Sequence, residues 1–206
     1  ARLFPKARIA RLDTDSTRKR GSHERILAEF RSRKIDILVG TQMVTKGHDF
    51  PGVTLVGVLQ PDQGMNLPDF RAAERTFQLL TQVAGRAGRG TLPGRVIIQT
   101  HTPHHYAIQA ASGHDYLGFY RKEIQIRKEL GLPPFSHLVQ ITIRSRDEKK
   151  AIRFSEKAAS FLKQKLPRSV KVLGPAPAII PKLRMQYRWQ VLLKASSLAA
   201  IEEDLT

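Results

Sequence analysis

The sequence predicts an α/β protein in which an incomplete parallel sheet with flanking helices precedes a small α+β domain. Over residues 8–100, short apolar runs of strand length alternate with amphipathic helical patterns, as in parallel sheets with crossover helices. From residue 135 onward the pattern becomes β-α-β-β-α, the order of a split βαβ or ferredoxin-like unit that lacks its final strand. With 206 residues and 41% hydrophobic content, the chain can form one large domain or two modest ones.

The first part is predicted to hold four strands and two helices. The strands are expected at residues 8–12, 35–39, 53–59 and 95–99. Ser22 is placed to N-cap a helix that carries Ile26, Leu27 and Phe30 on one face. A second helix is expected from about residue 69 to residue 83. In such sheets, functional groups gather at the carboxyl ends of the strands.

The second part begins with a helix over residues 106–130 that can break near Gly113 and stops at the Gly131–Pro134 segment. Residues 137–144 alternate polar and apolar side chains as a half-buried strand does. Asp147 caps a further helix, strands follow at 170–173 and 188–194, and Ser197 starts a last helix. We therefore divide the chain into a sheet domain (1–103), a helical connector (104–134) and a truncated C-terminal domain (135–206).

Basic residues dominate both halves of the chain. There are 35 Lys and Arg against 18 Asp and Glu, for a net charge of +17. Residues 1–100 carry 17 basic and 9 acidic side chains, and residues 101–206 carry 18 and 9. Such a field favours a polyanionic partner, above all nucleic acid. The chain has no cysteine, which excludes disulfides and thiolate metal sites, and no apolar run or leader indicates a membrane segment.

The densest motif is a glycine-rich segment, Gln82 to Gly90, with two arginines three residues apart, Arg86 and Arg89. Guanidinium groups stay charged and offer paired donors that match phosphate oxygens. Glycines let a ligand come close to the backbone. A helix C-cap alone would need only Gly90, so the motif indicates phosphate binding in phosphoryl transfer.

A second polar motif, Gly40 to Pro51, directly follows the strand at 35–39. Thr41 and Gln42 stand where a strand end can contact a phosphodiester backbone. Gly47 permits a tight turn, and Asp49 can accept a hydrogen bond from a ribose hydroxyl or orient an arginine. By itself, the segment is equally well explained as a polar loop in which Asp49 caps a turn.

Together these motifs resemble the second RecA-like lobe of superfamily-two helicases. The shared segments are Gly-Thr-Gln-Met (40–43) with Lys-Gly-His-Asp-Phe (46–50), the Asp69–Arg75 stretch, and Gln82–Arg89. More narrowly, the chain resembles the bacterial primosomal replication-restart DNA helicases. Gly-Leu-Pro-Pro-Phe (131–135), Val-Leu-Gly-Pro-Ala-Pro (172–177) and Tyr-Arg-Trp-Gln (187–190) are similar to that family's C-terminal domain. The resemblance covers essentially all of the chain.

The resemblance implies roles for matching positions. Arg86 and Arg89 would be arginine fingers on the ATP γ-phosphate, in a motif that also contains the nucleotide-binding Gln82 and Gly85. Gly47 and Asp49 would couple the nucleotide to DNA. The expected DNA contacts are Thr41, Gln42, Lys46 and, in a strand-end loop that can equally be a simple turn, Asp15 and Thr17. The expected setting is the bacterial cytoplasm.

Departures from the helicase pattern indicate which parts lie elsewhere. The chain contains no Gly-x-x-x-x-Gly-Lys-Ser/Thr segment, so the phosphate-binding loop and its magnesium ligand are missing. The activating Asp-Glu pair and the family's zinc-binding cysteines are also absent. We expect the chain to be part of a longer protein in which ATP and Mg²⁺ are shared with another lobe and zinc lies in an upstream segment. The 206-residue chain alone is predicted to hydrolyse no ATP.

Two weaker features complete the survey. His101, His104 and His105 lack a helical frame and a further ligand, so a surface loop is favoured over a metal site. Tyr187 and Trp189 either stack on a partner or face the core, and both interpretations stay open. The resemblance implies contact with forked or single-stranded DNA, single-stranded-DNA-binding protein and primosome proteins. We assign partner binding to Arg184, Arg188 and Gln190.

The sequence therefore favours the C-terminal part of an ATP-dependent 3′–5′ DNA helicase that unwinds branched DNA and assembles the primosome for replication restart. Polarity and fork role come from the resemblance. One alternative is a non-catalytic module that docks nucleic acid or protein on a helicase-like lobe. Another is a recombination or repair helicase, which should lack the domain over 131–194.

Overall fold

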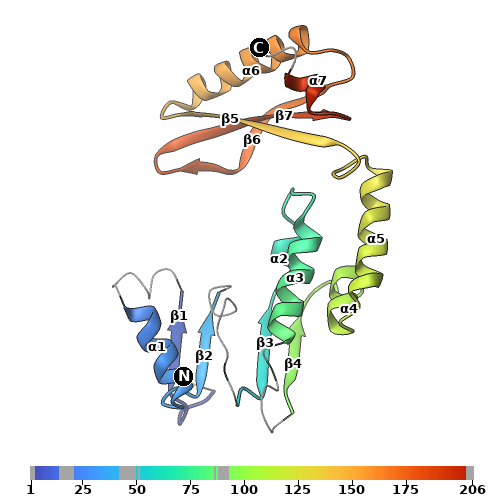
Figure 1. The fold of residues 1–206 in the computed structure, drawn as a ribbon. Helices are drawn as coiled ribbons and strands as arrows, with labels where there is room; N and C mark the ends of the chain where they lie inside the picture. Colours follow the sequence, from blue (N-terminus) through green and yellow to red (C-terminus); the bar gives the residue numbers. More distant parts are fainter. Residues whose placement is uncertain are drawn as a thin grey trace. The chain divides into compact units, whose positions relative to one another are not determined.

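The computed structural model describes residues 3–13, 21–41, 50, 52–85, 87 and 93–202. The chain forms two compact units, Ala1–Asn66 with Arg71–Phe119 and Leu67–Phe70 with Tyr120–Thr206. Helices and strands mix in both units (Figure 1), which confirms the α/β class. Among the described residues, no helix has the length and apolar character needed to cross a membrane. The domain limits at residues 103 and 134 stay a prediction.

The first unit begins with two parallel strands, β1 (Ile9–Leu12) and β2 (Ile37–Gly40). Helix α1 (Ser22–Arg31) lies between them in the sequence. A buried cluster of Leu12, Leu27 and Phe50 holds the helix on the sheet. The predicted cap was wrong by one residue. Gly21, with φ of 81°, is the N-cap and Ser22 is the first helical residue, because glycine adopts a left-handed φ without a Cβ clash.

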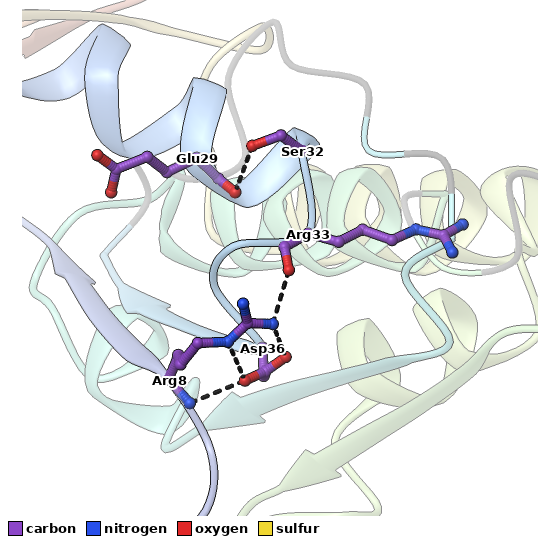
Figure 2. Close-up of polar contacts among 5 residues, drawn as sticks. All are labelled: Arg8, Glu29, Ser32, Arg33 and Asp36. Atoms are coloured by element: carbon purple, nitrogen blue, oxygen red, sulfur yellow. Dashed lines mark hydrogen bonds and ion pairs between the residues drawn. The ribbon is translucent and has the colours of Figure 1, made fainter.

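An ion pair joins the amino ends of β1 and β2. Arg8 Nη2 lies 2.7 Å from Asp36 Oδ1 and Arg8 Nε lies 2.9 Å from Asp36 Oδ2 (Figure 2). The same guanidinium donates to the carbonyl of Arg33 at 2.7 Å. Hydrogen bonds from Arg8 hold the pKa of the Asp36 carboxyl well below its usual value. Arg8 is therefore a structural clamp at the sheet edge opposite the one expected to bind ligands.

A second parallel pair consists of β3 (Leu55–Leu59) and β4 (Arg95–Gln99). Between them lie a short α2 (Asp62–Met65) and α3 (Ala72–Ala84). Strand β4 has its predicted limits, whereas α2 was not predicted and α3 begins three residues after the predicted start at 69.

Two further helices, α4 (Tyr106–Ser112) and α5 (Tyr116–Glu129), confirm the break near Gly113. In the first unit, Phe77 of α3 stacks on Phe119 with ring centroids 4.2 Å apart. The buried cluster around them also contains Leu80, Ala107, Ile108 and Ala111. This cluster fixes α3, and α3 in turn carries the chain toward the arginine motif.

The second unit is an antiparallel sheet in the order β5-β7-β6, formed by β5 (His137–Ser145), β6 (Lys171–Leu183) and β7 (Gln186–Ala195). Helices α6 (Glu148–Lys165) and α7 (Ala199–Glu202) lie on one face of it (Figure 1). Because β7 lies between β5 and β6, the β5-α6-β6 connection is a split βαβ unit, which confirms the predicted arrangement. Asp147 caps α6 as expected, accepting from the Lys150 amide.

Strand β6 is ten residues longer at its carboxyl end than predicted. Its pairing with β7 is interrupted between Leu173 and Ala176 and between Pro177 and Lys182. Such irregularities let prolines occupy a strand without breaking it. The prediction of a strand over 170–173 ends before these prolines, which cannot donate a ladder hydrogen bond.

Candidate functional site

Helix α3 ends at the start of the arginine motif. Its apolar side, which includes Phe77, Leu80 and Val83, is buried, whereas Gln82 and Gly85 are exposed. The amide of Gly85 donates to the Thr81 carbonyl at 3.0 Å, so the last helical turn is closed. Of the four residues assigned to this motif, Gln82 and Gly85 are described at an accessible helix end. Arg86 and Arg89 lie outside the described residues.

The conformation of Gly85 is one that any residue can adopt. Its φ is −69°, and a Cβ built there would lie 3.5 Å from the Thr81 carbonyl oxygen, an ordinary van der Waals distance. Backbone geometry therefore does not require glycine at this position. A requirement for glycine here would have to come from something that approaches the helix end.

The carboxyl ends of β1 and β2 meet at one edge of their sheet. Leu12 pairs with Gly40, so Asp13 and Thr41 follow at the same edge. Asp13 is buried and forms an ion pair with Arg11, while Thr41 is exposed. Thr41 thus occupies an accessible position at this strand end. Six other predicted residues lie outside the described ranges: Asp15, Thr17, Gln42, Lys46, Gly47 and Asp49.

A buried carboxylate, which we did not predict, organises the carboxyl ends of β3 and β4. Asp62 Oδ1 accepts from the hydroxyls of Thr100 and Thr102, each at 2.6 Å. The amides of His101 and Thr102 also donate to this carboxylate, at 3.3 and 3.2 Å. These hydrogen bonds, that of Thr100 foremost, hold the pKa of Asp62 well below its usual value. All four donors come from the chain after β4, so Asp62 anchors the end of one strand to the other.

Two histidines near Asp62, His101 and His105, take part in hydrogen bonds that involve the backbone. His101 contributes its amide to Asp62, and the His105 side chain caps α4 by accepting from the Ala107 amide at 3.2 Å. Among the described residues, no group of three or more His, Asp or Glu side chains is placed to hold a metal ion.

A polar and cationic surface lies on the face of the C-terminal sheet opposite α6. In β7, Val191, Leu193 and Ala195 are buried against α6 and its neighbours, so the alternate residues Arg188 and Gln190 occupy the other face. Gln190 accepts from the side chain of Gln140 on β5 at 3.0 Å, and Arg188 is the ladder partner of Arg144. We call Gln140, Arg144, Arg188 and Gln190 the β5–β7 basic face.

The arginines of the β5–β7 basic face are not fully compensated. Arg144 is exposed, and Arg188 is partly buried. The Nε atom of Arg188 is buried without a hydrogen-bond partner. Like charges directly across a ladder destabilise a sheet, and a buried donor without a partner adds to that cost. Both effects raise the free energy of the folded sheet.

The three residues assigned to partner binding do not form one site. Arg188 and Gln190 share the β5–β7 basic face, but Arg184 lies in the β6–β7 turn with Met185, both at positive φ (49° and 61°). Two-residue hairpins favour this conformation. The hairpin is hard to predict from the sequence, because Arg184-Met185 is not one of the dipeptides typical of such turns, Asn-Gly or Asp-Gly. Gln140 and Arg144 were missed because only the register of β5 against β7 brings them beside Arg188 and Gln190.

Strand alternation places Tyr187 and Trp189 on the α6 side of the sheet, and whether they also stack on a partner stays a prediction. Trp189 pairs with Ile143 and Pro177, and it shares the α6 side of the sheet with Val191. Tyr187, on the same side, accepts from Lys182 Nζ at 3.1 Å, and that ammonium lies 4.5 Å from the ring centroid. Both rings are partly buried.

Comparison with known protein families matches two separate parts of the chain. The sequence model for the Helicase conserved C-terminal domain matches residues 2–91. The model for the Primosomal protein N C-terminal domain matches residues 128–206.

Several curated relatives match nearly the whole chain. Replication restart protein PriA of Bacillus subtilis (strain 168) is 49% identical over 193 residues, which is 94% of this chain and 24% of the relative. The protein of that name from Synechocystis sp. is 46% identical over 194 residues, 94% of this chain and 23% of the relative. That from Treponema pallidum is 44% identical over 201 residues, covering 98% and 30%.

The chain thus spans about a quarter of the length of these relatives. The two matched domains occur in the order and at the positions of the two sets of motifs described above. The chain belongs to the PriA family of replication restart proteins, and it corresponds to the part that carries their helicase and primosomal C-terminal domains.

Proposed function

We propose that this chain is the C-terminal part of an ATP-dependent 3′–5′ DNA helicase that unwinds branched DNA and helps to reassemble the replication machinery. The observation that carries the proposal is the continuity of a helicase C-terminal domain and a primosomal C-terminal domain in one chain. A recombination or repair helicase would share the first of these but not the second.

The nucleotide end of the proposal rests on α3. This helix has a buried apolar side and ends with Gln82 and Gly85 exposed, which suits a surface facing a ligand held by another lobe. Arg86 and Arg89, next in sequence, would donate to phosphate oxygens. ATP with Mg²⁺, when bound, would supply the free energy for movement, and Gln82 and Gly85 would line the same surface.

The DNA end of the proposal rests on strand ends. Exposed Thr41 follows β2 at the carboxyl edge, and a hydroxyl there can donate to a backbone phosphate. Gln42, Lys46, Asp15 and Thr17 are proposed to extend this contact, with Gly47 and Asp49 linking it to the nucleotide. At the opposite edge, Arg8 and Asp36 form an ion pair with each other, so these two charges are already paired.

The β5–β7 basic face is proposed as a second contact with DNA. Its two facing arginines and two amides suit phosphates, which accept from both kinds of donor. Single-stranded-DNA-binding protein and primosome proteins are proposed as further partners on the strength of family membership, with Arg184 at the hairpin tip as one contact.

Two assays on two proteins test this function. The complete protein should unwind a forked DNA with a 3′ single-stranded arm in an ATP-dependent reaction. The 206-residue chain should bind the same DNA but hydrolyse no ATP, because its sequence contains no phosphate-binding loop. Failure of the complete protein to hydrolyse ATP on any DNA would favour a docking module instead.

A further inference from the structure

Helix α6 carries a row of alternating lysine and phenylalanine side chains on its exposed side. The row consists of Lys150, Phe154, Lys157, Phe161 and Lys165, spaced 4, 3, 4 and 4 residues apart. At about 100° per residue these positions fall within one narrow stripe. We call these five residues the α6 stripe.

The α6 stripe is exposed although it contains two large apolar rings. Phe154 and Phe161 are 58% and 54% exposed, and all three lysines are exposed. The residues that pack α6 on the sheet are different ones, namely Ala151, Ser155, Ala159 and Leu162. Phenylalanine at two positions on one line of a helix is therefore not explained by the core of this unit. Aromatic centres with a charged surround are typical of protein-binding surfaces.

We propose that the α6 stripe docks an acidic amphipathic helix of a partner protein. The spacing of 4 and 3 residues is that of a helix–helix seam. Phe154 and Phe161 are seven residues apart, about 10.5 Å along the helix axis, which matches residues seven apart on a partner helix. The lysines between and beside the rings would pair with Asp or Glu of the partner. This binding function goes beyond the proposed helicase activity.

Two other occupants fit the α6 stripe less well. A single strand of nucleic acid stacks successive bases on neighbouring rings, but here Lys157 separates two rings that are about two turns apart. A second copy of the stripe would bring lysine rows against each other, which opposes association. An acidic helix satisfies the rings and the charges together.

Fluorescence anisotropy with two probes on the 206-residue chain tests the proposal. One probe is a labelled 18-residue helical peptide with leucines seven residues apart and glutamates three and four residues from each leucine. The other is a single-stranded dT20 oligonucleotide. The peptide should bind, and the double variant Phe154→Ser with Phe161→Ser should weaken it by about tenfold or more. Oligonucleotide binding should stay within about twofold of the parent.

Charge variants provide the matched control. Lys150→Glu with Lys157→Glu should abolish peptide binding. Lys149→Glu with Lys163→Glu changes the net charge by the same amount but lies outside the α6 stripe. This variant should retain most of the peptide binding. Because all substituted residues are exposed, melting temperatures should match the parent. The proposal is overturned if the peptide does not bind, if the phenylalanine variant binds it normally, or if that variant loses the oligonucleotide instead.

Discussion

Arg144 and Arg188 stand directly opposite each other on β5 and β7, as Cα partners in the antiparallel ladder. They occupy the sheet face opposite α6, beside the hydrogen-bonded pair of Gln140 and Gln190. Facing arginines repel each other, so this pairing lowers the stability of the free sheet. A polyanion that neutralises both would recover that cost on binding, which links the local geometry to the strongly basic composition.

The facing arginines lead to a prediction about salt. Arg144→Gln with Arg188→Gln should weaken binding of dT20 to the 206-residue chain. It should also reduce the slope of log affinity against log salt by about one per arginine. Arg168→Gln, an exposed position outside the sheet, should change the slope little. An unchanged slope in the double variant would show that phosphates bind elsewhere.

The same arginines lead to an opposite prediction for stability. Removing one charge from the facing pair should leave the melting temperature unchanged or raise it by about one degree, which is the size of shift expected from one cross-strand pair. The measurement is thermal unfolding of Arg144→Gln at low salt. A marked fall would mean that Arg144 makes a structural contact that outweighs the repulsion.

Asp62 predicts a pH-dependent contribution to stability. The pKa of this carboxyl is lowered in the folded protein, so its stabilisation is present above the unfolded pKa of about 4. It is lost progressively as pH falls below that value. Asp62→Asn should lower the melting temperature by about 5 °C at pH 7. The difference between parent and variant should shrink between about pH 5 and pH 3.

The difference in melting temperature between parent and Asp62→Asn at each pH removes the contributions of other acidic groups. These include Asp36, whose pKa is also lowered. Thr100→Val with Thr102→Val should show the same destabilisation at pH 7, because it removes the two hydroxyl donors. A difference that is flat with pH would show that the Asp62 carboxylate does not act through its charge.

Gly85 separates folding from function. The φ of Gly85 is −69°, and there is room for a Cβ at this position. Gly85→Ala should therefore leave the free energy of unfolding unchanged or raise it by up to about 1 kcal/mol, and the melting temperature should not fall. In the complete protein the same change should impair ATP hydrolysis if a ligand approaches this helix end. A lower melting temperature of Gly85→Ala would show instead that the fold itself requires glycine at this position.

Most elements were predictable because each depends on short-range pattern. The apolar run over Arg95–Gln99 and the cap at Asp147 lie in the sequence itself, and both were found with correct limits. Strand β6 was cut short because its passage through prolines depends on irregular pairing with β7. Helix α2 has only four residues, too few for a periodic pattern.

The site was predictable to the extent that motifs are contiguous. Gln82, Gly85 and Thr41 could be assigned from neighbouring residues, and the assignment of their roles stays a prediction. Arg144 and Gln140 could not, because they join Arg188 and Gln190 only through the register of two strands distant in sequence. The role of Asp62 could not be predicted, because Pro61-Asp62 has the composition of a turn and its partners lie 38 and 40 residues away.

In the proposed function, the arginine motif after α3 acts on bound nucleotide within a helicase. The most direct test of this role is the DNA-stimulated ATP hydrolysis rate of the complete protein with Arg89→Ala, measured beside its affinity for forked DNA. We expect a rate loss of about 10³-fold or more, with affinity for forked DNA within about twofold of the parent. Normal hydrolysis, or a parallel loss of DNA affinity, would contradict it.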